Sequence, residues 1–242
     1  MDSMTAKELA QQEFNGIAVA KPYYDLLGEI EIGAVGLIWG ENYSGKSTFA
    51  LGFANALADF GRVEYIPAEE HFGITLTKKV NQLKAYSPNL HFRKYKGLES
   101  LKVWLKSVDS DVVFIDSVSV LHENDKEVVD FAQWCREHDI GMWMVNHANK
   151  DKTYKGSSML AHEADIKIVV TKDDKSATTE KNRYLGESRT IQVPFTADKI
   201  HGTSKKPKKS RKKKSKAKKK ARKNKNPDFD SSMDEIEQMM NV

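Results

Sequence analysis

Nine consecutive residues, GENYSGKST at positions 40–48, have the types and the spacing needed to hold phosphate groups. The two glycines allow the backbone N–H groups between them to turn inward around anionic oxygens. Lys46 can then reach the outer phosphates of a nucleotide, and the hydroxyl of Ser47 can bind Mg²⁺. The sequence therefore predicts a nucleotide site formed by Gly40, Glu41, Asn42, Tyr43, Ser44, Gly45, Lys46, Ser47 and Thr48.

Carboxylates at two further places could complete this chemistry. Asp116 ends the apolar run DVVFID, and a carboxylate at the end of a neighbouring parallel strand would support Mg²⁺ through water. Glu69 and Glu70 follow another apolar run in YIPAEEH, where a carboxylate could orient and deprotonate an attacking water. The alternative for this acidic pair is a solvated turn that begins the next helix.

Alternating apolar and amphipathic segments would position these residues. The order of strands and helices predicts an α/β fold with a mostly parallel sheet flanked by helices. Two late strands, 164–171 and 189–195, are candidates for antiparallel pairing. The other expected strands are 34–40, 62–68, 90–95, 111–116 and 141–146, and the expected helices are 47–60, 73–83, 98–108 and 126–138.

The two ends of the chain differ in composition from the middle. Residues 1–25 form a mostly polar N-terminal segment, and residues 26–200 are the expected core. Residues 201–226 are polybasic, with fifteen Lys or Arg and no acid between positions 205 and 225, so we expect them to be disordered. The tip, 227–242, is acidic with interleaved apolar residues. The basic tail predicts a nucleic-acid arm that includes Lys212, Lys213 and Lys214, with a solubilising or localisation role as the alternatives.

Cysteine usage and hydropathy restrict the class of protein. Cys135 is the single cysteine, which excludes an intrachain disulfide and a cysteine-based zinc site. The first residues contain no apolar signal core, and no apolar run approaches about 18 residues. We therefore expect a soluble cytoplasmic protein without a membrane partner.

Taken together, these motifs resemble the RecA-like ATPase core, and most closely its RadA (Sms) branch, over about residues 20–200. GLIWGENYSGKST looks like the strand and Walker A loop, and DVVFIDSVSVL like Walker B leading into a DNA-facing loop. YIPAEEH is similar to the segment with the catalytic glutamate, which maps to Glu69. VNHANK resembles the sensor segment and places His147 near the γ-phosphate. The resemblance implies ATP and Mg²⁺, with Ser47 and Asp116 on the metal.

Two further segments resemble parts of RadA that contact a neighbouring subunit or DNA. KNRYLG (181–186) resembles the RadA motif K-N-R-F-G, with Leu185 as an insertion. In that family the motif reaches a neighbouring subunit's nucleotide, which implies that Lys181 and Arg183 act at interfaces of a ring or filament; solvated charges in a turn are the alternative. YKGSSMLAHEADIKIVV (154–170) is similar to the second DNA loop, so single-stranded DNA would contact Lys150, Lys152, Tyr154 and Lys155. An ordinary flexible loop is the alternative there.

The departures from RadA narrow the functional expectation. RadA carries a four-cysteine zinc module and a protease-like C-terminal domain, and this chain has one cysteine and a charged tail in their place. The layout resembles short phage-encoded RecA-like ATPases used for recombination or single-strand annealing, which would work in the cytoplasm of a bacterial host. A replicative-helicase-like motor and an ATP-assembled annealing scaffold are the alternatives. The acidic tip would contact the basic arm or a single-strand-binding protein.

Overall fold

The computed structural model describes residues 4–11, 16–121 and 123–193. The chain divides into two units, Met1–Ser204 and Lys205–Val242. The second unit lies entirely outside the described residues, and so do Lys212, Lys213, Lys214 and the acidic tip. Their roles stay predictions.

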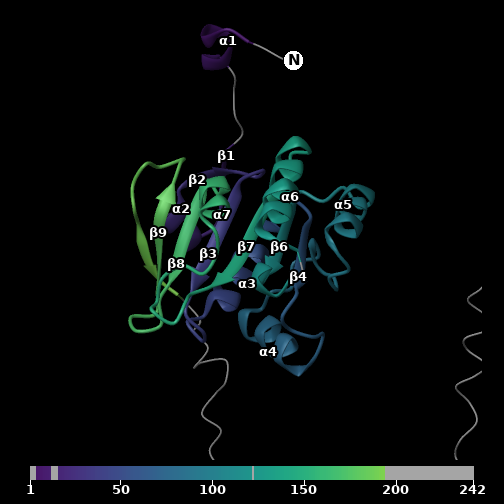
Figure 1. The fold of residues 1–242 in the computed structure, drawn as a ribbon, viewed down its shortest axis with the longest axis vertical. Helices are drawn as coiled ribbons and strands as arrows, with labels where there is room; N and C mark the ends of the chain where they lie inside the picture. Colours follow the sequence, from purple (N-terminus) through teal and green to yellow (C-terminus); the bar gives the residue numbers. More distant parts are fainter. Residues whose placement is uncertain (1–3, 12–15, 122, 194–242) are drawn as a thin grey trace, which may run out of the picture. The chain divides into compact units, whose positions relative to one another are not determined.

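An eight-stranded sheet organises the described part of the chain, in the order β10-β9-β8-β3-β7-β6-β4-β5 (Figure 1). The six strands from β8 to β5 pair in parallel, and the two at the other edge pair antiparallel. This confirms the α/β fold with a mostly parallel sheet. The strands are β3 (Val35–Gly40), β4 (Val63–Pro67), β5 (Leu90–Phe92), β6 (Val112–Asp116), β7 (Gly141–His147), β8 (Ile166–Val170), β9 (Ser176–Asn182) and β10 (Thr190–Gln192).

The late strands confirm part of an expectation and correct the rest. β8 pairs antiparallel with β9, as expected, but on its other side it runs parallel to β3, with Gly36 opposite Ile166 and Gly40 opposite Val170. The reason is the helix α7 (Ser158–Glu163), which returns the chain from the carboxyl end of β7 to the amino end of β8. β10 is antiparallel to β9, as expected.

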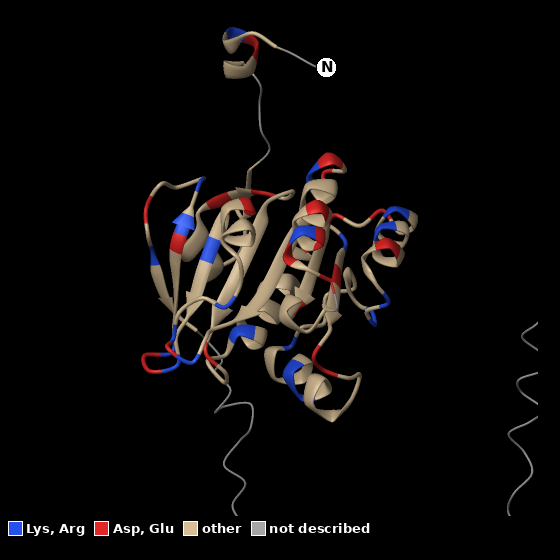
Figure 2. Cartoon of the chain, in the orientation of Figure 1, with Lys and Arg blue, Asp and Glu red and all other residues tan. Residues whose placement is uncertain are grey.

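Helices cover both faces of the sheet because successive strand residues point to opposite sides. In β7, Trp143 and Val145 face the layer of α2 (Tyr23–Leu27), α3 (Lys46–Leu57) and α4 (Ile74–Leu83). Met142 and Met144 face the layer of α5 (Leu98–Ser107), α6 (Asp125–Glu137) and α7. Figure 2 shows the central strands almost without charged residues, which gather instead in the helices and loops. A short 3₁₀ turn, η1 (Val118–Val120), follows β6.

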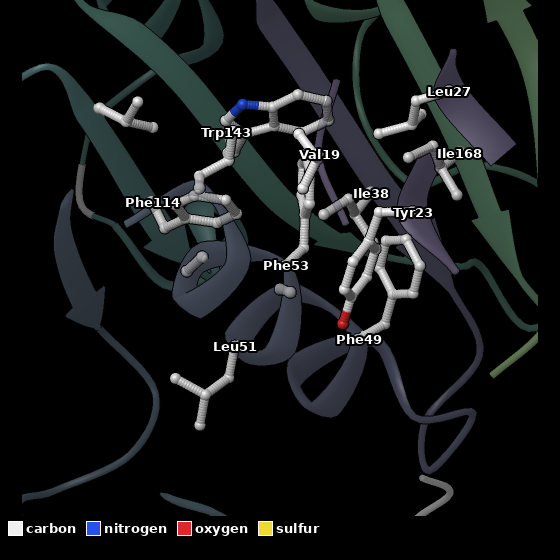
Figure 3. Packing of buried hydrophobic residues seen from close by; sticks show 14 of the residues in the cluster. Val19, Tyr23, Leu27, Ile38, Phe49, Leu51, Phe53, Phe114, Trp143 and Ile168 are labelled. Atoms are coloured by element: carbon white, nitrogen blue, oxygen red, sulfur yellow. The ribbon is translucent and has the colours of Figure 1, made fainter. Parts of the chain in front are cut away.

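An aromatic cluster fixes α3 against the sheet. Figure 3 shows Phe53 of α3 pointing toward Trp143, and their ring centroids lie 4.6 Å apart in an edge-to-face arrangement. Gly36 lies under the same indole, where an added Cβ would come within 2.1 Å of the ring. Because Gly36 has no side chain, Trp143 can pack against β3 at this position. The contact between Trp143 and Phe53 then positions α3, the helix that follows the phosphate loop, against the sheet.

The N-terminal part of the chain contributes to this core. β1 (Gly16–Ala18) pairs antiparallel with β2 (Glu29–Glu31) in a separate two-stranded sheet. Val19 and Tyr23, which the sequence placed in the polar N-terminal segment, are buried in the α3 layer. The first helix, α1 (Ala6–Ala10), begins with a capping box between Thr5 and Glu8 and buries none of its side chains.

The four tryptophans divide into two groups. Trp39 and Trp143 are buried, whereas Trp104 and Trp134 are only partly buried beneath basic side chains. Within the described part of the chain, no helix combines the length and the apolar character needed to cross a membrane.

Candidate functional site

The phosphate loop lies between the carboxyl end of β3 and the start of α3 at Lys46. Gly45 is the N-cap of α3 in a left-handed conformation, φ 101°, and no side chain caps the first turn. The N–H groups at this helix start are therefore available to an anion, and the helix dipole adds to their attraction. Tyr43 also has a left-handed backbone, φ 63°, and its side chain is 76% exposed at the mouth of the loop.

Lys46 lies beneath the loop with only 6% of its surface exposed. Its Nζ donates to the backbone carbonyl of Glu41 at 2.7 Å. Burial lowers the pKa of Lys46, and the charges of Asp116, Glu69 and Glu41 oppose that shift. The buried hydroxyl of Ser44 has no hydrogen-bond partner. A polyanion bound in the loop would offset the desolvation of Lys46 and give Ser44 an acceptor.

Asp116, at the end of β6, is 7% exposed and accepts a hydrogen bond from the hydroxyl of Tyr65 at 2.7 Å. Burial raises its pKa, and the hydroxyls of Tyr65 and Ser47 act in the opposite direction. The structure thus brings Ser47 and Asp116 together. In the described part of the chain no three acidic, His or Cys side chains gather as a metal cage. Two oxygen donors fit Mg²⁺, which takes its remaining ligands from phosphates and water.

Glu69 is held in place by three groups from neighbouring strands. Its backbone N–H donates to the carbonyl of Asp116 at 3.2 Å, and its Oε1 accepts from the hydroxyl of Ser117 at 2.8 Å. The Nε2 of His147 makes a hydrogen bond to the same Oε1. The hydrogen bond from His147 is the largest cause of the lowered pKa of Glu69; burial raises the pKa, and Ser117 lowers it further. The carboxylate is therefore kept ionised and fixed in orientation.

Replacing His147 with alanine is expected to raise the pKa of Glu69, because the largest stabilising contact of the carboxylate is lost while burial remains. A base works only when ionised, so activity falls as the pH drops through its pKa. If Glu69 is the base that the sequence predicts, the acid limb of ATP hydrolysis should therefore move to higher pH in His147→Ala. A pH–rate profile checks this, with exposed His71→Ala as the control. An unmoved acid limb would contradict the assignment.

Lys46, Ser47, Glu69, Asp116 and His147 line one cavity of about 620 Å³. Glu70, beside Glu69, points to Lys79 of α4 and forms an ion pair with it instead of contacting Ser117 or His147. The carboxylate of Glu69 is thus the one fixed opposite the phosphate loop. The sequence-predicted residues that line the cavity are Asn42, Tyr43, Gly45, Lys46, Ser47, Thr48, Glu69, Asp116, His147 and Lys155.

Lys181 and Arg183 lie away from this cavity within one chain. Lys181 pairs in register with Lys167 near the amino end of β8, whereas the phosphate loop follows the carboxyl end of β3. The Nζ of Lys181 donates to the carbonyls at the end of α7, at 3.0 Å for His162. Arg183 forms an ion pair with buried Asp165 at 2.8 Å. About five strand residues, roughly 16 Å, separate this cluster from the chain's own phosphate loop.

The predicted DNA loop is folded back toward the phosphate loop. Ala148 and Tyr154 form an isolated antiparallel bridge. Lys152 makes ion pairs with Glu41 of the phosphate loop at 3.1 Å and with Asp173 at 3.3 Å. Lys150 is exposed.

Tyr154 is less open than a stacking platform would be. Its ring is half-buried, 5.8 Å from the ring of Trp39, and the ammonium of Lys167 lies over both rings. Its hydroxyl accepts from the side-chain amide of Asn146 at 3.3 Å. This packing covers part of the ring that was expected to meet a base.

Sequence reasoning missed several residues of the site. Ser117 could have been predicted because it directly follows Asp116. Tyr65 could have been predicted because it carries a hydroxyl on the strand next to β6. The wall formed by α4 was not expected, although Thr75, Lys78 and Lys79 have the spacing of one helical face.

Comparisons with known proteins agree with this architecture. No known family profile matches the chain. DNA repair protein RadA from Campylobacter jejuni is 26% identical over 187 residues, 70% of this chain and 42% of RadA. RadA from Streptococcus pneumoniae is 24% identical and covers 64% of the chain. The chain thus spans less than half the length of these RadA proteins. DNA repair and recombination protein RadB from Methanobrevibacter smithii is 24% identical over 67% of this chain and 85% of RadB.

Two solved structures share the fold. The flagellar accessory protein FlaH from Methanocaldococcus jannaschii superposes with a TM-score of 0.57 at 16% identity, covering 75% of this chain and 95% of FlaH. The KaiC-like protein PH0186 from Pyrococcus horikoshii gives a TM-score of 0.57 at 17% identity, covering 75% and 93%. The chain is therefore a distant relative of the RadA and RadB DNA repair proteins, built on an α/β fold of the RecA- and KaiC-like kind.

Proposed function

We propose that the chain hydrolyses ATP. The observation that carries this proposal is the fixed carboxylate of Glu69, which lines the same cavity as Lys46, Ser47 and Asp116. A phosphate loop alone would support binding. An oriented, ionised carboxylate facing that loop supports a reaction of the bound phosphates with water.

The roles of the residues follow from their positions. The loop N–H groups and Lys46 bind the phosphates and neutralise the charge that develops on transfer. Ser47 and Asp116 would hold Mg²⁺, which supplies further charge neutralisation when bound. Glu69 accepts a proton from water as the water oxygen bonds to the γ-phosphorus. The bond from that phosphorus to the bridging oxygen breaks, releasing ADP and inorganic phosphate.

The proposal extends to single-stranded DNA and assembly. We infer a role in homologous recombination or single-strand annealing, as a phage-type protein in a bacterial cytoplasm. The names of the RadA and RadB relatives support the part of this proposal that concerns DNA repair and recombination. The polybasic arm would bind the DNA backbone in a salt-dependent way. Copies would form a ring or filament with ATP between them, because Lys181 and Arg183 are too far from their own chain's phosphate loop to act there.

The test is ATP hydrolysis measured with and without single-stranded DNA, for the full chain and for a chain ending at Ser204. Stimulation by DNA that survives truncation would support a DNA site on the core. Stimulation lost with the tail would make the basic arm the DNA receptor and remove that role from the loop at Lys150–Lys155. Absence of hydrolysis under every condition would overturn the ATPase and favour the ATP-assembled scaffold.

A further inference from the structure

The wall of the cavity that faces the phosphate loop is unusually rich in lysine. Lys78 and Lys79 come from α4, and Lys155 comes from the segment after β7. None of the three belongs to the phosphate loop. Together with Lys46 they place four ammonium groups around one cavity, opposed by the carboxylates of Glu69, Glu70 and Asp116.

The acidic groups of this cavity already have partners. Glu69 is bound by Ser117 and His147, Asp116 by Tyr65, and Glu70 by the ammonium of Lys79. The ion pair with Glu70 neutralises Lys79. No carboxylate of the cavity therefore remains to pair with another lysine.

Lys78 and Lys155 are the cations left over. Both are exposed, and neither side chain makes an ion pair or a hydrogen bond within the described part of the chain. Lys78 is held at the wall by its helix. Lys155 is fixed through its backbone N–H, which donates to the carbonyl of His147 at 3.0 Å. Two lysines without ion-pair partners in the lining of one cavity favour an anion as its occupant.

The position of these lysines indicates which part of a nucleotide they meet. The phosphate loop and Lys46 would hold the outer phosphates of a nucleotide, which places the terminal phosphate in the cavity that Glu69 lines. Lys78 lies on the first helix after Glu69, and Lys155 is bonded to His147, which contacts Glu69. Both lysines thus line the same cavity as Glu69.

We propose that Lys78 and Lys155 form a same-chain clamp for the terminal phosphate of a bound nucleoside triphosphate. The clamp lets a single chain distinguish a triphosphate from a diphosphate before a neighbouring copy contributes its cations. This inference rests on the proposed nucleotide site. It moves Lys155 from DNA contact to nucleotide recognition.

The test compares the dissociation constants of ATPγS and ADP, each with Mg²⁺, for the unaltered chain and for Lys78→Gln and Lys155→Gln. Each variant should bind ATPγS about 5- to 20-fold more weakly, the effect of losing a charge-assisted hydrogen bond, and ADP within about 2-fold of the unaltered chain. Lys84→Gln is the matched control, because Lys84 caps the same helix and does not line the cavity. Lys78→Arg should restore most of the ATPγS affinity.

The outcomes separate this inference from the proposed function. Variants that bind ATPγS as tightly as the unaltered chain, or that lose ATPγS and ADP equally, would overturn the clamp and leave the ATPase intact. An unaltered chain that binds neither nucleotide would overturn the proposed function and the clamp together.

Discussion

Glu69→Gln is expected to lower the rate of ATP hydrolysis by about 10²- to 10⁴-fold while leaving ATP affinity almost unchanged. Glutamine keeps the shape of the side chain and an oxygen that can accept from the hydroxyl of Ser117. It cannot take a proton from water. Single-turnover hydrolysis and equilibrium binding of ATPγS measure the two effects separately.

Glu70→Gln is the matched control for this experiment. Glu70 is adjacent in sequence but forms an ion pair with Lys79 and contacts neither Ser117 nor His147. Its loss should change the rate far less than the loss of Glu69. A larger rate loss in Glu70→Gln than in Glu69→Gln would transfer the role of base to Glu70.

Lys46→Ala is expected to weaken ATP binding at least about 100-fold, because the ammonium makes charge-assisted contacts with more than one phosphate. The buried Lys46 is already oriented by the carbonyl of Glu41, so little ordering is needed when phosphate arrives. Isothermal calorimetry with ATP and Mg²⁺ gives the affinity, and thermal unfolding checks that the variant is folded.

Lys106→Ala provides the control for lost positive charge, since Lys106 is an exposed lysine of α5 outside the cavity. Its affinity for ATP should match that of the unaltered chain. If Lys46→Ala remained folded and kept its ATP affinity, the phosphate loop would not be the nucleotide site.

The fold was predictable wherever an apolar run or a helical period was long enough to read. β3, β6 and β7 appear within a residue or two of their expected bounds because their side chains are buried on both faces. β9 was not predicted, since SATTEKN has no apolar run. One of its buried polar residues is satisfied by a distant part of the chain: Asn182 donates to the carbonyl of Leu27 at 3.1 Å. Pairing of that kind cannot be read from local sequence.

The site was predictable where the chemistry depends on adjacent residues. The spacing around Lys46 and the strand end at Asp116 predicted two residues that the structure brings into one cavity. The positions of Lys152 and Lys155 were harder to predict from sequence. The bridge between Ala148 and Tyr154, six residues apart, folds their loop back toward the phosphate loop. A polar composition predicts a loop but not the direction in which it turns.

The separation of the phosphate loop from Lys181 and Arg183 has a consequence for symmetry. If these cations act on a nucleotide, they must act on one held by another copy. Each chain would then contribute cations from one end of its sheet and bind a nucleotide at the other end. A two-fold dimer could meet this requirement only if both ends of the sheet lay in one self-complementary surface. Head-to-tail contacts need no such shared surface, and they either close into a ring or continue as a filament. In a filament, one terminal copy would hold a nucleotide that no neighbour completes.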